Sequence, residues 1–180
     1  MNRRTSLLTI TGLAVVAAVA VPTAVYANQA SPNSMESIRA VTADYQSFAN
    51  SQADGFTTLV ATQTTPPVSC ISNGTAGAMG QHYANGARVG DGVIQKQRPE
   101  VLLYEPQADG SKKLVGVEYV VLAADWMKKH SSPPVLFGKT FGLTTENPFG
   151  LPPFYALHAW AWQSNPSGDF SAWNPTVTCP

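Results

Sequence analysis

The sequence predicts an α+β domain, in which an N-terminal amphipathic helix packs on a mostly antiparallel sheet. Two patterns along the chain support this fold class. Apolar residues first recur at three- and four-residue steps, and short alternating runs typical of strands follow them. Fourteen prolines and fourteen glycines among 180 residues indicate a loop-rich domain whose elements are short.

The expected helix begins after Asn33, whose side chain can cap the first turn while Glu36 returns the contact from the third helical position. Its apolar stripe covers residues 35–59. The helix ends near residue 54 or continues into a second short helix. Because such a stripe is stable only when it is buried, the helix needs a sheet or another helix beside it.

Four later runs have the alternation and composition of strands, with turn signals between them. They cover residues 79–84, 100–105, 113–123 and 154–163. Asp109-Gly110 separates the second run from the third and predicts a hairpin turn. Within the second run, Glu100 and Glu105 are expected to be solvated.

Residues 1–27 have the features of a signal peptide and are excluded from the fold. Arg3 and Arg4 start the segment with positive charge, residues 7–21 are apolar, and cleavage is expected after Ala27. The apolar run is shorter than the ~20 residues that a spanning helix needs, so no stable membrane anchor is expected. The paired arginines fit either general or twin-arginine export. Residues 28–180 would then form a single secreted or periplasmic domain.

The charge composition argues against several functions. Lys plus Arg and Asp plus Glu each number 11, so the formal net charge is zero, and only 12% of residues are charged. A nucleic-acid-binding surface needs clustered cations that displace counterions from phosphates. We therefore expect no nucleic-acid partner.

The two cysteines, Cys70 and Cys179, predict one disulfide, because an even pair in an exported chain usually forms a bridge. This bridge would tie the C-terminal segment to the region that follows the helix. Two free thiols or thiolate metal ligands are the alternative, although neither cysteine has a histidine or a second cysteine at ligand spacing.

Three residues embedded in apolar runs suggest a metal site: His82, Glu118 and His158. Strand alternation puts Glu118 on one face with Gly116 and Val120. A buried carboxylate is costly to keep ionised without a cation or hydrogen bonds, and two neutral imidazoles bring no countercharge. Two histidines and one carboxylate form an open site for a divalent transition metal, with zinc or copper favoured and iron next. Its free position would take water or a small-molecule ligand.

Neighbouring aromatic residues are expected to complete this site. Tyr83 and Tyr119 would supply hydrogen-bonding groups around the ligands, and Trp160 would supply an apolar wall. The three ligand candidates are far apart in the sequence and form no short ligand motif. The hypothesis therefore depends on the fold to bring them together.

Other interpretations of the same residues stay open. The histidines could be core residues bonded to carbonyl groups, with Glu118 paired to Arg88 or Arg98. Glu118 could also act as the general base of a hydrolase without a metal. In a third interpretation, the aromatic C-terminal third, with Trp160 and Trp162, serves a metal-free extracellular binding or envelope structural protein. Packing in a small β core is the favoured explanation of those aromatic residues.

Several blocks of the sequence resemble a family of secreted bacterial proteins of uncharacterised activity. The blocks have the patterns GAMGxHY, LVGVEY, YxLHxW and NPxGxFxxWNP, and they lie at residues 77–83, 114–119, 155–160 and 165–175. The resemblance spans roughly residues 70–180. It implies a defined exported domain that includes His82, Glu118 and His158, and it implies no particular activity.

Overall fold

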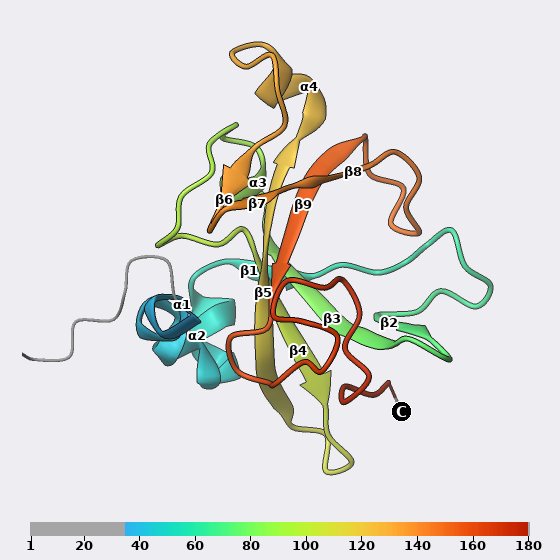
Figure 1. Ribbon diagram of the computed structural model, residues 1–180. Coiled ribbons are helices and arrows are strands. Elements are labelled where there is room, and N and C mark those ends of the chain that lie inside the picture. The colour runs from blue at the N-terminus through green and yellow to red at the C-terminus, as the bar shows by residue number, and fades with distance from the viewer. Residues whose placement is uncertain (1–34, 180) are drawn as a thin grey trace, which may run out of the picture.

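The computed structural model describes residues 35–179 of the chain. The expected signal peptide, the linker after it and the capping residue Asn33 lie outside the described residues. In Figure 1 a twisted sheet runs through the middle of the molecule, with short N-terminal helices beside it and long loops around it. No helix within residues 35–179 is long and apolar enough to cross a membrane.

Within the described residues, seven strands form the main sheet, and each pair of neighbours in it runs antiparallel. The strand order is β1-β3-β4-β5-β9-β8, and β2 also pairs with β3. The seven strands are β1 (Phe56–Thr58), β2 (Cys70–Asn73), β3 (Gly77–Asn85), β4 (Val101–Pro106), β5 (Lys112–Leu122), β8 (Gly142–Thr144) and β9 (Phe154–Ala159). A separate small sheet pairs β6 (Val135–Leu136) with β7 (Lys139–Thr140). The predicted α+β class with a mostly antiparallel sheet is confirmed.

The four runs read from the sequence correspond to β3, β4, β5 and β9. The predicted hairpin turn joins β4 to β5, and Gly110 adopts the left-handed conformation there with φ 84°. Strand β9 ends at Ala159, earlier than expected. Beyond it the Trp160 backbone N–H donates to the Asp169 carbonyl, and the Trp162 N–H still reaches the Val115 carbonyl of β5, so the chain stays beside the sheet without regular strand pairing.

The N-terminal helical region is divided into three short pieces. They are α1 (Met35–Thr42), the 3-10 turn η1 (Ala43–Gln46) and α2 (Phe48–Ala53). Ser47 lies between the last two in an extended conformation, so the helical hydrogen bonds cannot continue through it. Phe48 packs edge-on against Tyr83 and Tyr104 of the sheet, with ring centroids 4.9 and 5.3 Å apart. The remaining helices are short, α3 (Gly86–Val89) and α4 (Ala123–Met127).

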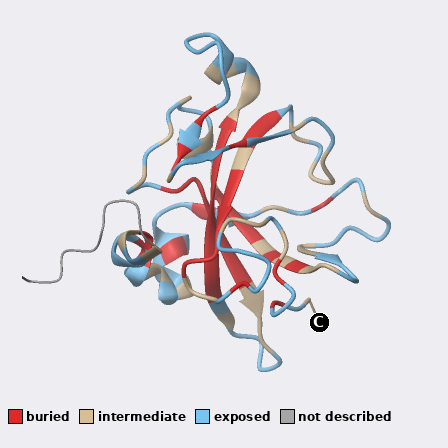
Figure 2. Cartoon of the chain, viewed as in Figure 1, coloured by how far each residue is buried: buried red, intermediate tan, exposed pale blue. Residues whose placement is uncertain are grey.

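Figure 2 shows that the central strands consist mostly of buried residues. Side-chain alternation gives the sheet two different faces, and each carries a buried cluster. The first face packs against the N-terminal helices through residues such as Leu102, Val117 and Tyr119. The second face carries another cluster that includes Leu103 and Val120. In β5, Val117 and Tyr119 therefore lie on the first face and Val120 on the second, as the alternation within residues 113–123 predicted.

The burial of Glu100 differs from the expectation that this residue is solvated. It is only 2% exposed, and its carboxylate accepts a hydrogen bond from the Val120 backbone N–H at 3.0 Å. Because β4 begins at Val101, no backbone carbonyl of that strand reaches Val120, and the Glu100 carboxylate takes its place. Burial raises the pKa of Glu100 to about 8. The expectation of a solvated Glu100 is therefore wrong.

Cys70 and Cys179 form the predicted disulfide, with their Cα atoms 5.6 Å apart. The bridge joins the first residue of β2 to the C-terminal segment. That segment also contacts the sheet near Gly77, where the Asn174 carbonyl leaves no room for a side chain. The C-terminal segment is thus held along the edge of the second face.

Replacing both cysteines by serine should lower the free energy of unfolding by roughly 4 kcal/mol, because the bridge restricts the unfolded chain over a long loop. Denaturant unfolding followed by circular dichroism measures this difference. Reduction of the wild-type protein should give the same decrease. An unfolding midpoint that is unchanged in both samples would contradict this account of the bridge.

Candidate metal centre

Three different strands supply the candidate ligands on the second face of the sheet. His82 comes from β3, Glu118 from β5 and His158 from β9. Glu118 and His158 are directly opposite each other in neighbouring strands. His82 is opposite Leu103 of the intervening strand β4, so its imidazole reaches over that strand towards Glu118. The three residues that were selected from the sequence therefore converge in space.

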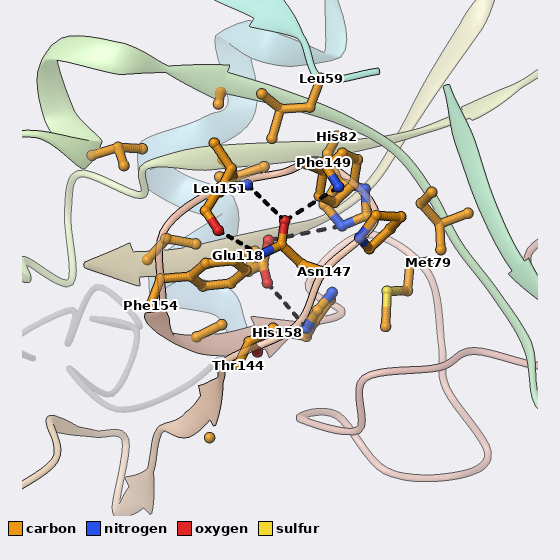
Figure 3. A pocket seen from close by; sticks show the side chains of 18 of the residues that line it. Leu59, Met79, His82, Glu118, Thr144, Asn147, Phe149, Leu151, Phe154 and His158 are labelled. Carbon is orange, nitrogen blue, oxygen red and sulfur yellow. Dashed lines mark hydrogen bonds and ion pairs between the residues drawn. The ribbon is translucent and has the colours of Figure 1, made fainter. Parts of the chain in front are cut away.

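Glu118 lies between the two imidazoles, and each of its oxygens faces one of them (Figure 3). Its Oε2 is 3.8 Å from Nε2 of His82, and its Oε1 is 3.6 Å from Nδ1 of His158. Both distances are too long for hydrogen bonds. The two rings are nearly perpendicular, at 87°, with centroids 6.0 Å apart. The polar groups thus surround a common point without bonding to one another.

The spacing of these groups fits a small transition-metal ion. One ligand atom from each residue lies within 4.8 Å of the other two. Two donors on one tetrahedral zinc ion, each about 2.1 Å from the metal, would be roughly 3.4 Å apart. The two measured carboxylate–imidazole distances exceed this value by a few tenths of an ångström, a change that side-chain rotation can supply. The cluster could therefore hold a metal ion.

Burial sets the protonation states of the three residues. Glu118 is 6% exposed, and burial alone raises its pKa to about 8. Burial lowers the pKa of His82 to about 4. Burial and the neighbouring His82 lower the pKa of His158 to about 3. At neutral pH the imidazoles are therefore uncharged, as metal ligands must be, and without a cation Glu118 is mostly protonated. A metal-free Glu118 is then poorly suited to act as a general base at neutral pH.

The protein's own cations do not neutralise Glu118 in the described part of the chain. Arg88 donates to the Pro99 carbonyl at 3.0 Å and covers the Phe56 ring. Arg98 pairs with Asp91 at 3.4 Å. The suggested pairing of Glu118 with either arginine is therefore not found.

The two remaining ring nitrogens also lack partners. Nδ1 of His82 and Nε2 of His158 are buried and have no hydrogen-bond partner among the described residues. A core histidine held by a carbonyl group would not leave both nitrogens unbonded. The Gly80 backbone lies close enough to His82 to oppose the lowering of its pKa, but without the geometry of a hydrogen bond. The arrangement disfavours the interpretation of both residues as ordinary core histidines.

The expected neighbours of the ligands are only partly correct. Tyr83 and Tyr119 follow His82 and Glu118 directly in their strands, so alternation turns them to the opposite face, where they pack with the N-terminal helices. The Tyr119 hydroxyl donates to the Lys96 carbonyl there, at 2.8 Å. The prediction that these tyrosines contact the ligands is wrong.

Trp160 does lie beside the site. Its ring is nearly parallel to the His158 imidazole, with an interplanar angle of 22° and centroids 6.1 Å apart. Trp160 can approach the sheet because the residue below it is Gly116. A Cβ at that position would lie 2.8 Å from the Ala159 carbonyl oxygen and 3.3 Å from the Trp160 Cα. The indole N–H donates to the Ser171 carbonyl at 2.6 Å, which fixes the ring.

The three candidate ligands line a cavity of about 680 Å³ on the second face. Most of its other walls are apolar, and they include Leu59, Met79, Val89, Leu122, Leu151 and Phe154. Ligand sites in proteins commonly combine such apolar walls with a few convergent polar groups. The polar centre is thus part of a small-molecule-sized pocket.

A loop between β8 and β9 forms one wall of this pocket, a role that was not predicted from the sequence. Asn147 organises the loop, since its side chain accepts from the Phe149 and Leu151 backbone N–H groups and donates to the Leu151 carbonyl. These bonds place the Phe149 ring against His82, with centroids 5.4 Å apart (Figure 3). Asn147-Pro148 is a turn signal in the sequence, but it does not indicate which strand the loop covers.

The aromatic residues of the C-terminal third do not form an exposed platform. Trp160 is 2% exposed, and Phe154 and Tyr155 are also buried. Trp162 packs against the buried cluster on the first face of the sheet, and its indole N–H donates to the Thr42 hydroxyl at 3.0 Å. These positions favour a packing role for the aromatic residues over a surface that stacks on sugars.

No protein-family model, curated protein or solved structure matches this chain significantly. The resemblance to a family of secreted bacterial proteins therefore stays a prediction. The functional argument depends on the geometry of the site itself.

Replacing Glu118 by Gln should stabilise the metal-free protein, and the gain should increase as the pH rises. The pKa of Glu118 is higher in the folded protein, about 8, than in the unfolded chain. Between these two pKa values the unfolded chain loses its proton first, so the free energy of unfolding falls as the pH rises. The amide cannot ionise, so it avoids this loss. We expect an advantage of a few kcal/mol at pH 8, and almost none near pH 4.

Urea unfolding of both metal-free proteins at several pH values measures the difference. Glu100 is common to both proteins, so its titration cancels. An advantage that is independent of pH would contradict the buried, uncompensated carboxylate.

Proposed function

We propose that this chain is a secreted metal-binding domain in which His82, Glu118 and His158 hold one divalent transition metal. The centre would lie in an apolar pocket and keep at least one coordination position open. The observation that carries this proposal is a buried carboxylate whose two oxygens each face a neutral imidazole and to which residues 35–179 supply no cation.

The donor set favours particular metals. Two imidazole nitrogens suit zinc, copper and iron, whereas magnesium and calcium prefer sites built from oxygen donors. Zinc or copper is our first choice and iron the next. Three protein ligands with an open fourth position are typical of centres that activate water or bind a substrate.

The proposed location outside the cytoplasm has independent support. The N-terminal segment has the sequence features of an export signal. The disulfide between Cys70 and Cys179 agrees with this location, because such bridges persist in oxidising compartments.

The purified protein should bind one zinc ion per chain, and alanine at any one of the three ligand positions should reduce the affinity at least about a hundredfold. His130→Ala is the matched control, because His130 is exposed and stacks on Trp126. Competition with a chromogenic chelator gives the affinity, and elemental analysis gives the stoichiometry.

The control should bind zinc as the wild-type protein does. The same competition measurement with Cu(II) and Fe(II) ranks the metals. Equal zinc loading of the wild-type protein and all three ligand variants would overturn the assignment.

Zinc affinity should increase nearly tenfold between pH 6 and 7, about fivefold between pH 7 and 8, and then level off. Below its pKa of about 8, Glu118 carries a proton that the metal must displace, so binding becomes easier as the pH rises. The histidines add nothing to this slope, because their pKa values of about 4 and 3 leave them uncharged throughout.

Calorimetry in buffers of different ionisation enthalpy should accordingly show nearly one proton released per zinc ion at pH 7. An affinity independent of pH over this range would show that Glu118 is not the titrating ligand.

A further inference from the structure

We infer that the pocket binds an apolar monocarboxylate, whose carboxylate completes the coordination of the metal while its hydrocarbon part fills the cavity. This inference rests on the proposed metal centre and names the ligand class for it. Two observations carry the inference: the size and apolar lining of the pocket, and the distribution of charge around it.

The pocket is too large for a metal and its water molecules alone. Its volume of about 680 Å³ lies within the range of about 300–1,000 Å³ that is usual for sites of drug-sized ligands. Leu59, Met79, Val89 and Phe154 contribute to walls that offer contact area and few hydrogen bonds. An extended or aromatic hydrocarbon gains most from such walls, whereas a sugar or a peptide would lose its hydrogen bonds with water.

The charges around the pocket favour a ligand with a single carboxylate group. A divalent metal bound to one carboxylate keeps one net positive charge, which is costly in an apolar cavity unless an anion neutralises it. Among the described residues that line the pocket there is no lysine or arginine, and Glu146 is an exposed acid. A carboxylate could thus be neutralised only at the metal, and a second anionic group would meet no cation.

The polar groups gather at one place in the pocket, so the ligand's carboxylate and its hydrocarbon part would bind at different places. His82, Glu118 and His158 meet at one place on the sheet, while Ala156 and Val120 continue the same face next to them with apolar side chains. Ala156 is two residues before His158 in β9 and therefore points to the same side. A larger residue there would fill pocket volume and leave the ligand atoms in place.

Dodecanoate binding to the zinc-loaded and chelator-treated proteins tests the inference. The loaded protein is dialysed against zinc-free buffer before titration, so that no free zinc binds the fatty acid. Isothermal titration calorimetry should show that zinc tightens dodecanoate binding at least about tenfold. Dodecan-1-ol, which has the same chain without the charge, should bind both forms within about twofold, and acetate should bind at least about a hundredfold more weakly than dodecanoate.

Two variants locate the site. Ala156→Phe should keep the zinc stoichiometry and lose at least about tenfold in dodecanoate affinity, because the ring occupies the pocket. Ala108→Phe, at the exposed tip of the β4–β5 hairpin, is the matched control and should bind as the wild-type protein does.

The two proposals fail in different ways. If the protein binds one zinc ion but dodecanoate binds equally with and without it, or not at all, the ligand class is wrong and the metal centre stands. If Ala156→Phe loads zinc and still binds dodecanoate normally, the carboxylate site is elsewhere. If the wild-type protein binds no metal, the proposed function fails, and this inference fails with it.

Discussion

The site is governed by one electrostatic constraint: a carboxylate is buried between two imidazoles, and the described part of the chain supplies it with no cation. Burial raises the pKa of Glu118 and lowers those of both histidines, so the metal-free site is uncharged at neutral pH. The side chains are also too far apart to satisfy one another by hydrogen bonds. A divalent cation resolves both problems together, because it ionises the carboxylate and uses the imidazole lone pairs.

The antiparallel sheet turns this constraint into a defined geometry. Register alone sets Glu118 opposite His158, and the intervening strand β4 holds His82 at the right distance to reach across. Gly116 lets Trp160 close one side of the centre, and the loop organised by Asn147 brings Phe149 against the other imidazole. The N-terminal helices cover only the first face. The second face is therefore available for a pocket, and the sheet presents its polar centre among apolar walls.

The sequence predicted much of the scaffold and the identity of the candidate ligands. Its periodicity located the main strands, and unusual polar residues in apolar runs identified His82, Glu118 and His158. Their convergence was not predictable, because it depends on the strand order, which local periodicity does not encode. The error at Tyr83 and Tyr119 came from treating sequence neighbours as spatial neighbours, although adjacent strand residues face opposite sides. Glu100 and the loop around Asn147 were missed because their roles depend on contacts with distant strands.

The most direct test of the account is anomalous X-ray diffraction from crystals of the zinc-loaded protein, recorded on both sides of the zinc absorption edge. The account predicts one strong anomalous peak that lies about 2.0–2.2 Å from Nε2 of His82, Nδ1 of His158 and a carboxylate oxygen of Glu118. A peak at another place, or fully loaded protein with no peak between these three side chains, would contradict it.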